Sequence, residues 1–123
     1  MDMRDYQIDL DVKYGLELID VDAIERAAPA GWFNRTLCQV NDCVIRLGVA
    51  EGEFHWHKHK REDEFFFVVS GELLVDLEDR STVELKPNQG YAVPRGLAHG
   101  TRAPQRTIML KVEGATVSPA GDA

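Results

Sequence analysis

Apolar and polar residues alternate with a period of two along much of the chain after residue 33. The alternation is clearest in the segments 43–49, 72–78 and 108–113. Gly, Pro, Asn and Asp residues that favour turns separate the segments, as at 41–42, 87–90 and 94–96. Short strands at such close spacing predict an antiparallel β-sandwich or barrel.

The segment Phe65–Val69 is apolar at every position. On a strand its side chains point alternately to two faces, so both faces must be buried. We expect Phe66 and Val68 to line the barrel. The outer residues Phe65, Phe67 and Val69 would then be covered by a second sheet or by a partner subunit.

One segment, residues 20–28, has the three- to four-residue apolar spacing of a helix. It begins with a capping Asp20 and stops before Pro29, which predicts about two helical turns. Asn41-Asp42 predicts a two-residue hairpin turn. The cysteines Cys38 and Cys43 would then be diagonal neighbours across the hairpin, a geometry that favours free thiols over a disulfide.

The length of 123 residues is that of one domain, and the net charge is −7. Residues 1–25 contain eight acidic and two basic residues, so most of the charge lies there. We interpret residues 1–30 as an acidic arm with a short helix, 31–118 as a β-barrel and 119–123 as a tail. An arm that docks on a neighbouring subunit is the alternative to a solvated arm.

Charge and hydropathy also limit the partners and the location of the protein. An acidic chain is a poor partner for nucleic acid or an anionic membrane. No apolar run approaches the length of a membrane span, and residues 1–5 lack the features of a secretion signal. We therefore expect a cytoplasmic protein that binds a small molecule.

Three of the four histidines, at positions 55, 57 and 59, lie in one short segment. Because residues two apart on a strand point the same way, His57 and His59 can face one point. Glu64 begins the next strand, and His99 follows the turn at 94–96. Imidazoles and a carboxylate suit a divalent transition ion and leave positions open for water or substrate.

The spacing of these residues resembles the two motifs of the cupin superfamily. His57, His59, Glu64 and Gly71 match the first motif, and Pro94, Gly96 and His99 match the second. Three positions depart from the pattern without removing a ligand. Asn88 stands in place of a glycine and Ala103 in place of an asparagine. Gly52, the glycine that precedes the histidines, is one residue closer to them than in the broad pattern. Over roughly residues 40–122, the chain resembles the small single-domain cupins called mannose-6-phosphate-isomerase-like.

The resemblance implies an all-β, cupin-type double-stranded β-helix (jelly-roll) barrel. It also implies one metal ion per chain held by His57, His59, Glu64 and His99, and a homodimer. The ion is Fe, Mn, Ni, Co, Cu or Zn, since such a site accepts all of them.

Two functions fit such a site. The first is an enzyme of dioxygenase, isomerase or lyase type, and the second is a metal-dependent module that binds or senses a small ligand. An enzyme needs an acid or base beside the ion. The candidates are Tyr91 and His55, then Arg95, although His55 also suits a surface or core position. We expect the lining to be otherwise apolar, and a second inward-facing polar pair would favour an enzyme.

Overall fold

The computed structural model describes residues 7–28, 31–53, 62–78 and 81–116, and most of their regular structure is β-strand. The elements, in chain order, are β1 (Gln7–Asp9), α1 (Val21–Ala27), β2 (Phe33–Val40), β3 (Cys43–Glu53), β4 (Glu64–Ser70), β5 (Leu73–Leu77), β6 (Val83–Leu85), β7 (Gly90–Val93) and β8 (His99–Gly114). The predicted all-β fold with a short N-terminal helix is confirmed.

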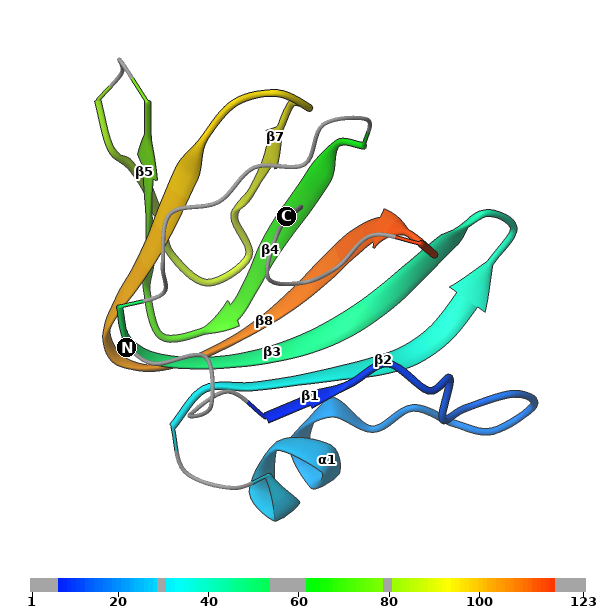
Figure 1. The fold of residues 1–123 in the computed structure, drawn as a ribbon. Helices are drawn as coiled ribbons and strands as arrows, with labels where there is room; N and C mark the ends of the chain where they lie inside the picture. The colour runs from blue at the N-terminus through cyan, green and yellow to red at the C-terminus, as the bar shows by residue number, and fades with distance from the viewer. Residues whose placement is uncertain (1–6, 29–30, 54–61, 79–80, 117–123) are drawn as a thin grey trace.

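The strand β8 connects the two sides of the barrel. Its first residues, His99–Arg102, pair with β5, and its second half pairs with β3 on one side and β4 on the other. Between these regions β8 turns sharply, as Figure 1 shows. The strands β1-β2-β3-β8-β4-β7 lie in that order, and β6 extends the sheet from β5. The sheet therefore folds back on itself around an interior.

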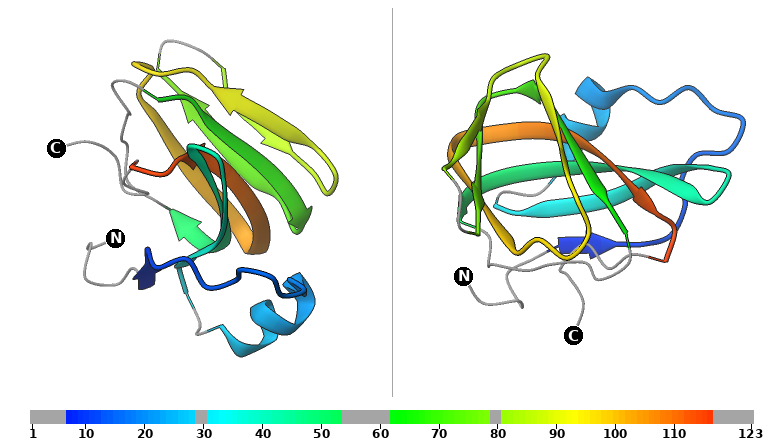
Figure 2. Two further views of the ribbon diagram at one scale, coloured as in Figure 1. Left: turned by 90° about the vertical axis from the view of Figure 1, so that its right-hand side faces the viewer. Right: turned by 90° about the horizontal axis from the view of Figure 1, so that it is seen from above.

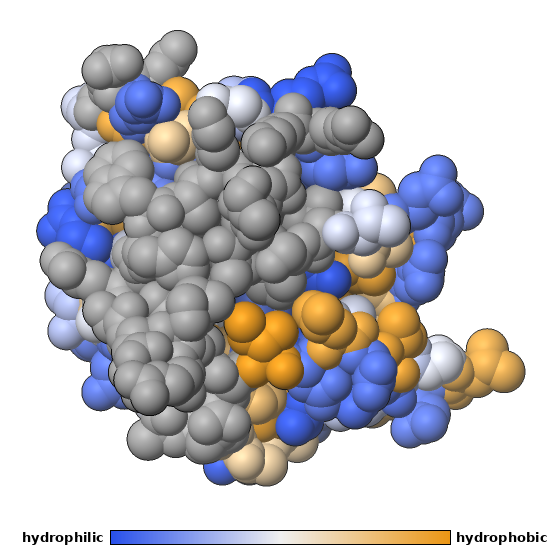
Figure 3. Space-filling model, viewed as in Figure 1, coloured by the Kyte–Doolittle hydropathy of each residue, from blue (hydrophilic) through white to orange (hydrophobic). Residues whose placement is uncertain are grey.

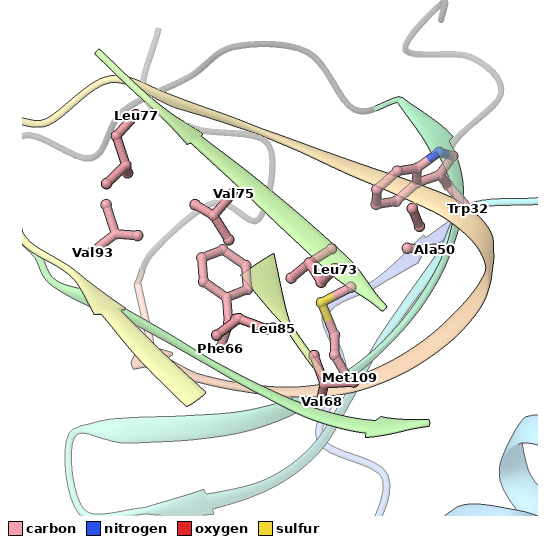
Figure 4. Packing of buried hydrophobic residues seen from close by; sticks show 11 residues of the cluster. Trp32, Ala50, Phe66, Val68, Leu73, Val75, Leu77, Leu85, Val93 and Met109 are labelled. Atoms are coloured by element: carbon pink, nitrogen blue, oxygen red, sulfur yellow. The ribbon is translucent and has the colours of Figure 1, made fainter. Parts of the chain in front are cut away.

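Apolar side chains fill much of this interior. Phe66 and Val68 of β4, Leu73 and Val75 of β5 and Met109 of β8 belong to one buried cluster. Figure 4 shows their side chains converging from strands on different sides. The prediction that Phe66 and Val68 line the barrel is confirmed.

A second apolar cluster lies on the opposite face of β2, β3 and β8. Leu47, Val49 and Ile108 on the strands pack there with Ile24 of α1. Figures 1 and 2 show α1 on the side of β2 and β3 that is turned away from β4, β5 and β7. The helix starts as predicted, because the Asp20 side chain accepts a hydrogen bond from the backbone N–H of Ala23. The helix thus covers an apolar face that water would otherwise reach.

The predicted turns are also present. Val40 pairs with Cys43 and Cys38 with Ile45, the register expected for a hairpin at Asn41-Asp42. Both cysteines are free. Asn88, at a motif position where glycine was expected, has a φ of 68°, in the left-handed region that asparagine tolerates.

Part of the acidic N-terminal segment is built into the sheet. β1 pairs in parallel with β2, and the backbone N–H of Tyr14 donates to the Leu37 carbonyl oxygen at 2.9 Å. Several apolar side chains of this segment are nevertheless exposed. The proposed tail at 119–123 lies outside the described residues, and the domain limits stay a prediction.

Candidate metal centre

Glu64 and His99 meet inside the barrel although 35 residues separate them in the sequence. Each is the first residue of its strand, β4 and β8, and the side chain of each is only 1% exposed. His99 Nε2 lies 3.1 Å from Glu64 Oε1. The Phe66 ring meets the His99 ring edge-on at a centroid distance of 6.0 Å. Two of the four ligands predicted from the sequence, Glu64 and His99, therefore lie side by side in a buried position.

The second ring nitrogen of His99 determines what this contact can be. His99 Nδ1 lies 3.1 Å from the carbonyl oxygen of Leu97, which can only accept a hydrogen bond. With its proton on Nδ1, a neutral imidazole presents a lone pair on Nε2 to the Glu64 carboxylate. Two acceptors at this distance require a cation between or beside them, either a proton or a metal ion. The donor set therefore fits a metal site.

A short turn places His99 next to Glu64. Gly96 has a φ of 81°, and the Leu97 N–H faces the Pro94 carbonyl oxygen at 3.4 Å. The Asp63 carboxylate, one residue before Glu64, accepts a hydrogen bond of 2.9 Å from the Arg95 backbone N–H. This bond joins the two segments that carry the ligands. Arg95 is an exposed residue, and the contribution of its backbone N–H is to hold these two segments together.

The other predicted ligands, His57 and His59, lie outside the described residues, as does the candidate acid or base His55. Within 7–28, 31–53, 62–78 and 81–116, no group of three His, Cys, Asp or Glu side chains gathers as a metal site would need. The four-residue ligand set therefore remains a prediction. The structure places two of its members together.

Charged residues line the barrel beside Glu64, and the sequence pattern alone did not identify them. Glu113 of β8 is the direct cross-strand partner of Glu64, and Lys111 of β8 lies opposite both Phe66 and Arg46. Arg46, Lys111 and Glu113 are all buried. The expectation of an otherwise apolar lining is wrong for part of β3 and β8, because many of their apolar residues, such as Leu47 and Ile108, face α1 instead. The alternation over 108–113 could have indicated these residues, because Lys111 and Glu113 share one face of that strand.

These side chains form a connected set of contacts. Arg46 donates from Nη1 to Glu113 Oε1 at 2.7 Å and from Nε to Thr36 Oγ1 at 3.0 Å. Lys111 Nζ lies 3.8 Å from Glu64 Oε2. Burial, reinforced by the negative charge of Glu64, raises the pKa of Glu113 to about 7, although Lys111 and Arg46 act in the opposite direction. A carboxyl group that titrates near neutral pH can serve as an acid or a base.

Tyr91, the remaining sequence candidate, lies on β7 opposite Phe66. Its side chain is half-buried and packs against the inner apolar cluster. The structure thus places Tyr91 at the wall of the interior, two residue pairs along β4 from Glu64.

Comparisons with known proteins agree with this architecture. The family model described as "Cupin domain" matches residues 43–112. The chain is 45% identical over 80 residues to the uncharacterized protein YdbB of Bacillus subtilis (strain 168), covering 65% of this chain and 71% of that protein. The mannose-6-phosphate-isomerase-like subgroup stays a prediction.

Solved structures show the same fold. A cupin-2 domain protein from Shewanella frigidimarina superposes with a TM-score of 0.74 at 28% identity, covering 79% of this chain and 94% of that chain. Ectoine synthase from P. lautus superposes with a TM-score of 0.66 at 17% identity, covering 81% and 78%. No helix in the described part of this chain is long and apolar enough to cross a membrane. Since the family model spans more than half of the sequence, the protein belongs to the cupin domain family.

Proposed function

We propose that the protein is a metal-dependent enzyme that acts on a small organic molecule inside the barrel. Glu64, His99, His57 and His59 would hold one divalent transition ion, which supplies Lewis-acid or redox chemistry when bound. The contact between His99 Nε2 and Glu64 Oε1 carries the proposal, because a fixed imidazole lone pair facing a carboxylate is suited to a cation.

The charged lining favours an enzyme over a module that only binds a ligand. A catalytic site needs a group that can hold or move a proton near the substrate. Glu113 is buried directly across the sheet from Glu64, and Arg46 fixes its Oε1 atom. Its neighbour Lys111 lies close to Glu64 on the same face. An inward-facing polar pair therefore stands beside the proposed ion, as chemistry would require.

Elemental analysis of the freshly purified protein tests the metal site. We expect about one transition ion per chain, since four nitrogen and oxygen donors make a complete protein ligand set. Replacing His57 and His99 together by alanine should abolish binding, because half of the donors are removed. His55→Ala is the matched control, since it removes a nearby histidine outside the ligand set and should leave the metal content unchanged.

Two results would contradict the proposal. One is wild-type protein that is free of metal and takes up none on reconstitution. The other is a double variant that stays folded and keeps its metal. Oxygen consumption and product formation with a panel of small molecules then separate an enzyme from a metal-dependent binding module.

A further inference from the structure

Lys111 is a buried cation with unused hydrogen-bonding capacity. Its side chain is 9% exposed, and its Nζ atom is 3.8 Å from Glu64 Oε2, beyond hydrogen-bonding distance. Within the described residues, the ammonium group makes this ion pair and no hydrogen bond. An ammonium group carries three donors, and its 3.8 Å contact with Glu64 uses none of them at hydrogen-bonding distance. Lys111 can therefore donate to a ligand in the interior.

The neighbouring cation, Arg46, already donates hydrogen bonds to other side chains. Arg46 lies directly opposite Lys111 on β3, and its guanidinium binds both Glu113 and Thr36. Glu113 is held in turn by Arg46. The two cations on this face thus differ: Arg46 holds other side chains in place, whereas the donors of Lys111 make no hydrogen bond within the described residues.

The charges of this cluster also favour an anion. With both carboxylates ionised, the charges of Arg46, Lys111, Glu64 and Glu113 sum to zero. The ion of the proposed metal site would add two positive charges inside the barrel, where buried charges interact strongly. An anionic ligand would neutralise this excess, and Lys111 reaches Glu64, the residue that would also bind the metal.

The space beside Lys111 limits the ligand. Phe66 is its direct neighbour on β4, and Met109 follows on the same face of β8. One ammonium group and one metal ion match the two oxygens of a carboxylate. A phosphate group would leave further oxygens facing this apolar wall, since the guanidinium of Arg46 is occupied.

We propose that Lys111 anchors a small carboxylate ligand at the metal of the barrel. This inference rests on the proposed metal site, and it names the class of substrate: a small organic acid whose carboxylate would accept a hydrogen bond from Lys111 beside the ion. Lys111 is thus a binding and specificity residue.

Titration calorimetry of the purified metal-containing protein with oxalate and its neutral diamide, oxamide, tests this role. We expect oxalate to bind the wild type and oxamide to bind at least about tenfold more weakly. Lys111→Gln should weaken oxalate binding about ten- to a hundredfold, the usual loss for one charge-assisted hydrogen bond, with the metal content unchanged. Lys111→Arg, which keeps the charge, should retain most of the affinity.

Lys86→Gln is the matched control, because it removes one lysine charge at a surface position that is 67% exposed. It should bind oxalate like the wild type. Equal affinity of wild type and a folded, metal-containing Lys111→Gln would overturn the proposal and leave the metal site intact. If Lys111→Gln does not fold, oxamide binding to the wild type as tightly as oxalate overturns it instead. A wild type without metal would overturn the proposed function first, and this inference with it.

Discussion

At the scale of single residues, Asp76 and Arg102 form a two-pronged ion pair between β5 and β8. Arg102 donates from Nε to Asp76 Oδ2 at 2.6 Å and from Nη2 to Oδ1 at 2.9 Å, and Thr82 also donates to Oδ1. The hydrogen bonds from Arg102 lower the pKa of the Asp76 carboxyl below its usual value, with a smaller contribution from Thr82. The pair therefore stabilises the fold whenever Asp76 is ionised.

This lowered pKa predicts a pH dependence of stability. Asp76 in the folded chain holds its proton more weakly than in the unfolded chain, so its contribution is present above the unfolded pKa and is lost as pH falls through the folded one. Asp76→Asn should therefore reduce the unfolding free energy at pH 7 by up to about 1 kcal/mol, the upper range for partly exposed pairs. The loss should be smaller at about pH 3, where more of the carboxyl group is protonated.

Urea unfolding of the wild type and the variant at both pH values measures this difference. Glu84→Gln is the control, because its ion pair with Lys86 is long, at 3.9 Å, and exposed. The interpretation of the Asp76 contacts would be wrong if Asp76→Asn destabilised the protein equally at both pH values.

Residue chemistry, spacing and motif resemblance together predicted that Glu64 and His99 share a site. The spacing of the histidines and the strand parity of Glu64 indicated a shared site, and motif resemblance added His99. Lys111 and Glu113 were missed for a physical reason. In the sequence they look like the solvent side of an amphipathic strand, and only the packing of α1 on the opposite face turns them inward.

At the scale of elements, Gly71 forms the turn that joins β4 to β5. It has a φ of 88°, and a Cβ atom there would overlap Thr107 Oγ1 and lie 2.8 Å from the Arg106 carbonyl oxygen. The same Thr107 oxygen accepts from the Glu72 N–H at 2.9 Å and donates to the Glu72 carbonyl oxygen at 2.9 Å. A side chain at position 71 would therefore disturb both the turn and its link to β8.

Gly71→Ala should lower the free energy of unfolding by more than about 1 kcal/mol, because conformational strain and steric overlap add. Alanine substitutions at two other glycines distinguish conformational strain from steric overlap. Gly31 has a φ of 84°, and no atom of the described residues lies within 4 Å of the position that a Cβ atom would take, so Gly31→Ala reports strain alone. Gly15 has neither feature, and Gly15→Ala should be almost neutral. Denaturant melts that rank Gly71→Ala equal to Gly31→Ala would refute the steric part of this explanation.

Local signals were sufficient for the other turns and for the helix. Asp20 caps α1, and the hairpin at 41–42 has the register expected from its two central residues. The parallel pairing of β1 with β2 was not predictable in this way. Its partners are separated by about 26 residues, and nothing in the short segment Gln7–Asp9 specifies which strand edge it joins.

At the scale of the whole molecule, β1 lies at the edge of the sheet among the described strands, with an exposed apolar row beside it. Ile8, Leu10 and Val12 are 38%, 55% and 48% exposed, and Leu16 and Leu18 are more exposed still. Figure 3 shows hydrophobic residues gathered where β1 and the following segment lie in Figure 1. Phe65, on the outer face of β4, is also 37% exposed. An unpaired sheet edge flanked by apolar residues favours association with another strand.

We expect a second copy of this chain to cover these residues, since the apolar row follows an unpaired edge that can be extended by the same strand from a partner. Light scattering should then report twice the chain mass of 13.8 kDa at micromolar concentration. Leu10→Lys and Val12→Lys together should shift the particle to the monomer mass, because burying two added charges in a subunit contact is unfavourable. Lys86→Glu, which changes an exposed charge elsewhere, should leave the mass unchanged. A wild-type particle of 13.8 kDa would show that this edge is exposed to solvent. If the charged double variant stays dimeric, the subunit contact lies at the outer face of Phe65 instead.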